Sequence, residues 1–122
     1  MRILFGLVLA LLAGCATGGD PAAEAKLALK CNNRAQCDRY WQRAQQWVAE
    51  NSEYKIRTVT DWVIMTESPG DFGFAAAYTI TKTPADDGGA AINLATVCAN
   101  FIPGLGSHQA TVERFNHYVA AP

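Results

Sequence analysis

Hydrophobic positions recur every three or four residues between Asn33 and Asn51, which predicts an amphipathic helix over this segment. Asn33 is a suitable N-cap, and Gln36 stands three residues later, as in a capping box. We expect the helix to bury its apolar stripe against a sheet. That stripe consists of Cys37, Trp41, Ala44, Val48 and Asn51, and Tyr40 and Trp47 flank it.

Three later segments carry the composition or the alternation that is typical of strands. Residues 54–66 are rich in β-branched and aromatic types and have apolar residues at both parities, which predicts one central strand. Residues 74–82 alternate cleanly, and residues 91–101 place apolar side chains on one parity. Runs of Pro, Gly, Ser and Asp separate the three segments, and short turns favour an antiparallel meander.

A second helix is predicted from Ser107, as its N-cap, to about Val119, with Val112 and Phe115 on its buried side. The order is then helix, three antiparallel strands, helix. This order predicts an α+β fold in the form of a two-layer sandwich. If both helices cover one face of the sheet, the other face needs a partner, the membrane surface or polar residues of its own.

The N-terminus carries a short apolar run, Ile3 to Ala13, after a positive charge at Arg2. A helix needs about 20 apolar residues to cross a bilayer, so this run is too short and predicts a signal peptide, here a signal helix. The run ends in Leu12-Ala13-Gly14-Cys15. These four residues resemble the lipobox of bacterial lipoproteins.

The lipoprotein resemblance implies cleavage before Cys15, a diacylglyceryl group on its sulfur and an acyl group on its new amine. Two or more acyl chains anchor a protein stably in a membrane, so Cys15 is the expected lipidation site. Ala16 stands where an Asp would favour the inner membrane in Gram-negative lipoproteins, so the resemblance implies the periplasmic face of the outer membrane. The alternative is an ordinary secretory signal that is cut after Ala13 or Ala16.

The expected domain organisation follows from these features. Residues 1–14 form the signal peptide, residues 15–25 the lipidated cysteine with a small, polar and flexible tether, and residues 26–122 a single small domain. The formal net charge of −1 gives no strongly basic face, which argues against a nucleic-acid partner. No motif indicates a cofactor.

The remaining cysteines are Cys31, Cys37 and Cys98, and the oxidising envelope favours one disulfide among them. Chain entropy gives about 2 kcal/mol to a Cys31–Cys37 bond and about 4 kcal/mol to a Cys37–Cys98 bond. Proximity favours Cys31–Cys37, which we expect, with Cys98 as a buried free thiol. The alternative, Cys37–Cys98, stays open. The cysteine spacings lack the paired short intervals of a zinc site, and no metal is expected.

Trp41, Trp47 and Trp62 are the candidate binding surface, although core packing against a sheet is the preferred explanation for Trp41 and Trp47. Asp61 is expected inside a strand, facing solvent or paired with Arg57, while His108 and His117 fall on the last helix. A small hydrolase that used Asp61 or these histidines ranks last, because no catalytic set converges in the sequence.

These observations favour a non-enzymatic envelope lipoprotein that acts through contacts with another envelope protein, as an assembly, scaffold or inhibitory module. The alternative is a binding module for a small apolar or cell-wall ligand, with Trp41, Trp47 and Trp62 as its aromatic surface.

Overall fold

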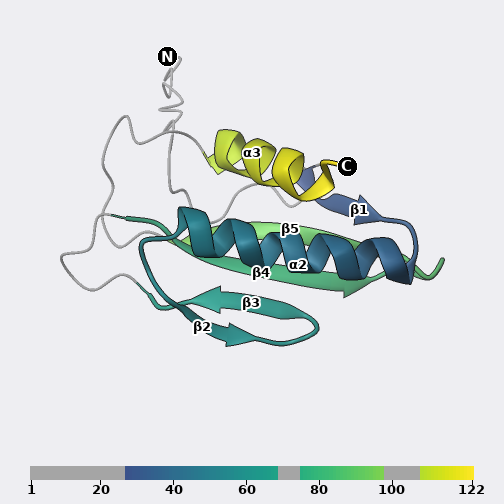
Figure 1. Cartoon of the computed structure of the whole chain (residues 1–122), viewed down its shortest axis with the longest axis horizontal. Coiled ribbons are helices and arrows are strands. Elements are labelled where there is room, and N and C mark those ends of the chain that lie inside the picture. The colour runs from purple at the N-terminus through teal and green to yellow at the C-terminus, as the bar shows by residue number, and fades with distance from the viewer. Residues whose placement is uncertain (1–26, 69–74, 98–107) are drawn as a thin grey trace, which may run out of the picture.

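A computed structural model describes residues 27–68, 75–97 and 108–122 (Figure 1). The predicted signal peptide, Cys15, the tether, Cys98 and Ser107 lie outside these residues. The described elements, in chain order, are β1 (Leu29–Cys31), α2 (Arg34–Asn51), β2 (Ile56–Val59), β3 (Val63–Thr66), β4 (Ala77–Pro84), β5 (Ala90–Val97) and α3 (His108–Ala120).

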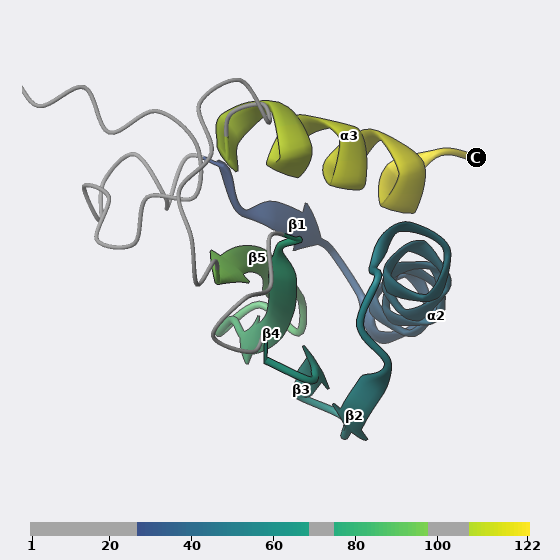
Figure 2. The ribbon, with the colours of Figure 1, turned by 90° about the vertical axis from the view of Figure 1, so that its left-hand side faces the viewer.

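The five strands form one antiparallel sheet in the order β1-β5-β4-β3-β2. Figure 2 shows both helices on one side of this sheet, with α3 toward the β1 edge and α2 beside it. The predicted α+β class is confirmed. The predicted number of strands is wrong, because the described part of the chain contains five strands rather than three.

Residues 54–66, predicted as one central strand, form the hairpin of β2 and β3 at an edge of the sheet. The Thr60 hydroxyl accepts hydrogen bonds from the backbone N–H groups of Trp62 (3.1 Å) and Val63 (3.0 Å), and the Thr60 N–H donates to Val63 O (2.8 Å). A side chain that bonds the neighbouring backbone in this way competes with an extended strand. The apolar residues at both parities therefore reflect a reversal of the chain.

Strand β1 was missed because three residues are too short to show a period, and its partner is distant in sequence. Leu29 pairs with Ile92, and Cys31 pairs with Ala90. Strands β4 and β5 match the two other predicted strands with shifted ends, and they remain paired up to the Pro84–Ala90 pair.

The first helix is confirmed together with its cap. The Asn33 side chain accepts a hydrogen bond from Gln36 N (2.8 Å), and the Gln36 side chain accepts one from Asn32 N (2.7 Å). These bonds satisfy backbone donors at the helix start. The second predicted helix is also confirmed, and its buried residues are Val112, Phe115 and Val119.

Trp47 joins the two helices to the sheet. Its ring meets the rings of Tyr78 on β4 and Phe115 on α3 edge-on, at centroid distances of 5.1 Å and 5.2 Å. Trp47 is only 4% exposed, so it belongs to the core. Burial raises the pKa of the Tyr78 phenol above its ordinary value, a shift that Arg114 opposes and Glu53 reinforces.

Candidate functional site

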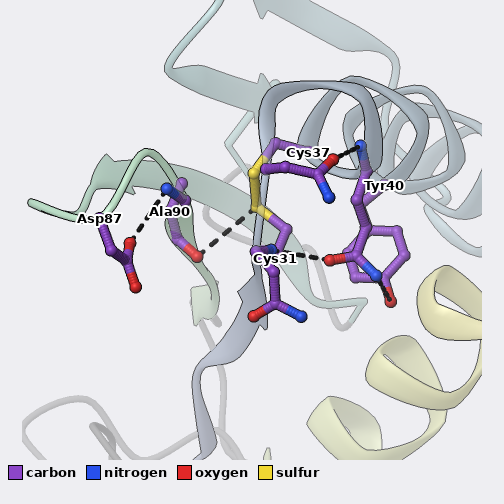
Figure 3. The surroundings of a disulfide bond; sticks show 9 residues. Cys31, Cys37, Tyr40, Asp87 and Ala90 are labelled. Carbon is purple, nitrogen blue, oxygen red and sulfur yellow. Dashed lines mark hydrogen bonds between the residues drawn. A yellow bond between two sulfur atoms is a disulfide. The ribbon is translucent and has the colours of Figure 1, made fainter.

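A disulfide joins Cys31 and Cys37, as predicted, with a Cα–Cα distance of 5.1 Å. It ties the end of β1 to the first turn of α2, and Cys31 Sγ lies 3.5 Å from Ala90 O on β5 (Figure 3). Both cysteines are buried. The bond therefore fixes the start of α2 against the edge of the sheet, and this junction forms one end of a groove.

The groove has a volume of about 630 Å³. It lies between the first half of α2, the β2–β3 turn and the β4–β5 turn, and Figure 1 shows these three segments at the same end of the sheet. Its size falls within the range of about 300–1,000 Å³ for small-molecule sites. The aromatic and polar side chains that line it are Arg34, Asp38, Trp41, Gln42, Gln45, Asp61, Trp62 and Lys82.

Two tryptophans meet at this groove around Lys82. Its ammonium nitrogen lies 4.8 Å from the centroid of the Trp41 ring and 5.5 Å from that of the Trp62 ring, within cation–π range. Trp41 is 6% exposed, and its indole N–H donates to Thr60 O (2.9 Å). Trp62 is 51% exposed. The structure thus brings Trp41 and Trp62 together and places Trp47 apart, in the core.

Gly89 in the β4–β5 turn allows the backbone to approach Cys31 closely. A Cβ atom on Gly89 would collide with the carbonyl oxygen of Cys31. Gly88 has a φ of +84°, a conformation that favours glycine. Asp87 accepts a hydrogen bond from Gly89 N (3.0 Å), which closes the turn.

The acidic and histidine candidates do not converge. Asp61 lies in the exposed β2–β3 turn. The prediction that it lies inside a strand is wrong, because the chain reverses direction at this point. His108 Nδ1 hydrogen bonds with the Thr96 hydroxyl, while His117 is exposed nearer the other end of α3. Within the described ranges, no group of three or more His, Cys, Asp or Glu residues is placed to hold a metal ion.

A second candidate surface is the face of the sheet opposite the helices, which we call the open face. The pairs Val63–Thr81 and Thr81–Asn93 form one row across it, and the rows alternate with buried positions such as Ile64 and Ile80. On β3, β4 and β5 its residues are all uncharged: Val63, Met65, Ala77, Thr79, Thr81, Thr83, Ala91, Asn93, Ala95 and Val97.

Large apolar side chains are exposed on this open face. Met65 is 36% exposed and Val97 is 41% exposed. Both helices of the described part lie on the other side of the sheet (Figure 2). The part of the open face on β3, β4 and β5 is therefore uncharged and partly apolar, while Lys30 on β1, which pairs with Ala91, places one charge at its margin.

No protein-family model, curated protein or solved structure matches this chain. In the ranges that the structure describes, neither helix is long and apolar enough to span a bilayer.

The sequence identified Trp41, Trp62 and Asp61 as candidates but missed Lys82 and the β4–β5 turn as parts of the same site. Lys82 lies on β4, the strand that follows β3, and only the register of β3 against β4 brings it beside Trp62. The Trp62 carbonyl accepts a hydrogen bond from Lys82 N (2.9 Å).

Proposed function

We propose that this chain is a small lipid-anchored protein of the bacterial envelope that acts through contacts with another envelope protein and performs no catalysis. The anchor is the lipidated Cys15, and the domain stands at the periplasmic face of the outer membrane. The lipobox-like residues Leu12-Ala13-Gly14-Cys15 support the anchor. The contacts serve an assembly, scaffold or inhibitory role.

The open face is the observation that supports protein contacts best. The cores of protein interfaces are depleted in charged residues, and this face has none on β3, β4 and β5. Met65, Thr79 and Ala95 lie in one row across it, and Met65 and Ala95 are exposed. Apolar and hydroxyl-bearing side chains on a rigid sheet suit a partner surface that is itself neutral.

The proposed tether keeps this surface close to the membrane. Residues 15–25 are mostly small and polar, and a flexible chain of this length has an end-to-end distance of roughly 20 Å. The partner is therefore expected among proteins that are themselves in or near the membrane.

A photo-crosslinking amino acid at Ala95, in intact cells, tests the protein contact. The expected result is one discrete crosslinked product from Ala95 and none from Gln46, which is exposed on α2. The substitution Thr79→Glu places a charge in the same row and is expected to abolish the product, whereas Gln46→Glu leaves it unchanged. Equal products from Ala95 and Gln46, or a product that survives Thr79→Glu in a folded protein, would contradict the proposal.

A further inference from the structure

The groove between α2 and the two hairpin turns lies on the helix side of the sheet, away from the open face. We propose that this groove binds a neutral sugar ring of a glycan, which stacks on Trp62 and forms hydrogen bonds with the polar side chains of α2. This binding activity is independent of the protein contact proposed above.

Trp62 has the geometry of a stacking platform. Half of its surface is exposed, although an indole of this size is usually covered in a folded domain. Its position is fixed on the backbone by the hydrogen bond from Trp62 N to the Thr60 hydroxyl and by the bond that its carbonyl accepts from Lys82 N. The ring itself is in contact with the Lys82 ammonium group, 5.5 Å from its centroid, and a ring that is restrained in this way loses less conformational entropy when a ligand covers it.

Lys82 and Trp41 help to hold Trp62 and its turn in position. The Lys82 ammonium group lies over both indole rings, and Trp41 hydrogen bonds to the β2–β3 turn that carries Trp62. Because Trp41 is buried and its only indole donor is already used, its role is to position the turn. Trp62 is therefore the tryptophan of the groove whose ring a ligand can contact.

The polar side chains along the groove are available to a ligand. Arg34, Asp38, Gln42 and Gln45 line the groove from α2, and Asp61 lines it from the β2–β3 turn. Within the part of the chain that the structure describes, none of these five side chains takes part in a hydrogen bond or an ion pair. They comprise carboxylate and amide acceptors together with guanidinium and amide donors.

The balance of charge identifies the class of ligand. The two cations, Arg34 and Lys82, are matched by two carboxylates, Asp38 and Asp61, so the groove selects neither an anion nor a cation. A purely apolar ligand would leave the polar lining without partners, which costs free energy. A neutral sugar satisfies both requirements, because its hydroxyl groups donate and accept while its C–H face packs on an indole.

The test uses the full chain, purified in detergent, on an array of neutral oligosaccharides that covers glucose, galactose, mannose and N-acetylhexosamine types. The array also carries uncharged peptides of similar length. We expect binding to at least one neutral oligosaccharide and weaker or no binding to the peptides. For the bound oligosaccharide, titration should shift the tryptophan emission to the blue and protect it from a soluble quencher. The affinity should change little with salt, because the groove has no net charge.

Two matched variants distinguish the groove from the rest of the hairpin. Trp62→Ala is expected to weaken binding about tenfold or more, whereas Trp62→Phe retains a stacking ring and part of the affinity. Val59→Ala removes a side chain that is 47% exposed on the same hairpin and should leave binding unchanged. The proposal is overturned if no neutral oligosaccharide binds, if the peptides bind more tightly, or if folded Trp62→Ala binds as well as the unmodified chain. Each result leaves the crosslinking test of the open face unaffected.

Discussion

Removal of the Cys31–Cys37 disulfide is expected to destabilise the domain substantially without changing its fold. The bond connects β1, which has only three residues, to the start of α2, and both sulfur atoms are buried. Without it, β1 is still held by its pairing with β5 and by the hydrogen bond from the Asn116 side chain to Leu27 O (2.8 Å). We therefore expect a weakened edge rather than an unfolded chain.

The size of the effect follows from the loop that the bond closes. For the sequence separation of 6, the chain-entropy model gives about 2 kcal/mol. A domain of this size loses about 4–8 °C in Tm for each kcal/mol, so the expected decrease in Tm is roughly 8–16 °C. A loss of about 2 kcal/mol is a large share of the 5–15 kcal/mol free energy of unfolding that is typical of a small domain.

Thermal unfolding of the double variant Cys31→Ala/Cys37→Ala provides the measurement. The unmodified chain with a reductant should unfold at a similar temperature to the variant, and the reductant should not change the variant itself. The double variant also prevents Cys37 from pairing with Cys98. If peptide mapping finds the Cys31–Cys37 bond fully formed and its removal lowers Tm by less than about 3 °C, the reasoning is refuted.

Three further predictions concern the turn, the helix cap and the buried phenol. Gly89→Ala should lower the free energy of unfolding in urea by about 2–3 kcal/mol, because the new Cβ collides with the backbone of Cys31. Gly88→Ala has open space around its Cβ and should cost only about 1–2 kcal/mol, for its left-handed φ. Equal losses for the two variants would count against the close approach. Asn33→Ala should lower the free energy of unfolding by about 1 kcal/mol through loss of the helix cap, and an unchanged urea midpoint would contradict this. The raised pKa of Tyr78 means that the unfolded chain loses this proton first, so stability should fall as the pH rises above about 10. Tyr78→Phe should reduce that fall, and an identical alkaline profile would argue against the burial effect.

The sequence predicted those elements whose signals are local. Helix α2 carries its own cap at Asn33 and its apolar stripe, and both are present in the structure. The β2–β3 turn contains a single common turn residue, Asp61, between Thr60 and Trp62, and it depends on the Thr60 hydroxyl, whose bonds to the backbone the composition alone does not reveal. Strand β1 depends on pairing with β5, a contact between residues far apart in the chain.

The candidate site, too, could be predicted from the sequence only where its signals are local. The sequence identified three tryptophans but did not separate their roles, because exposure depends on where each ring meets the rest of the fold. Trp47 is covered by Tyr78 and Phe115, whereas Trp62 lies in an edge turn with half of its surface exposed. Lys82 joins the site only through the pairing of β3 with β4.

The central claim is that lipid on Cys15 holds this domain at a membrane. Mass spectrometry of the N-terminal peptide, from protein isolated in the membrane fraction of cells that lipidate envelope proteins, tests it most directly. The account predicts a chain that begins at Cys15 with covalently attached acyl chains, and a Cys15→Ser variant that lacks them. A mature chain that begins at another residue, or an unmodified Cys15 on a protein that stays in solution without detergent, would contradict it.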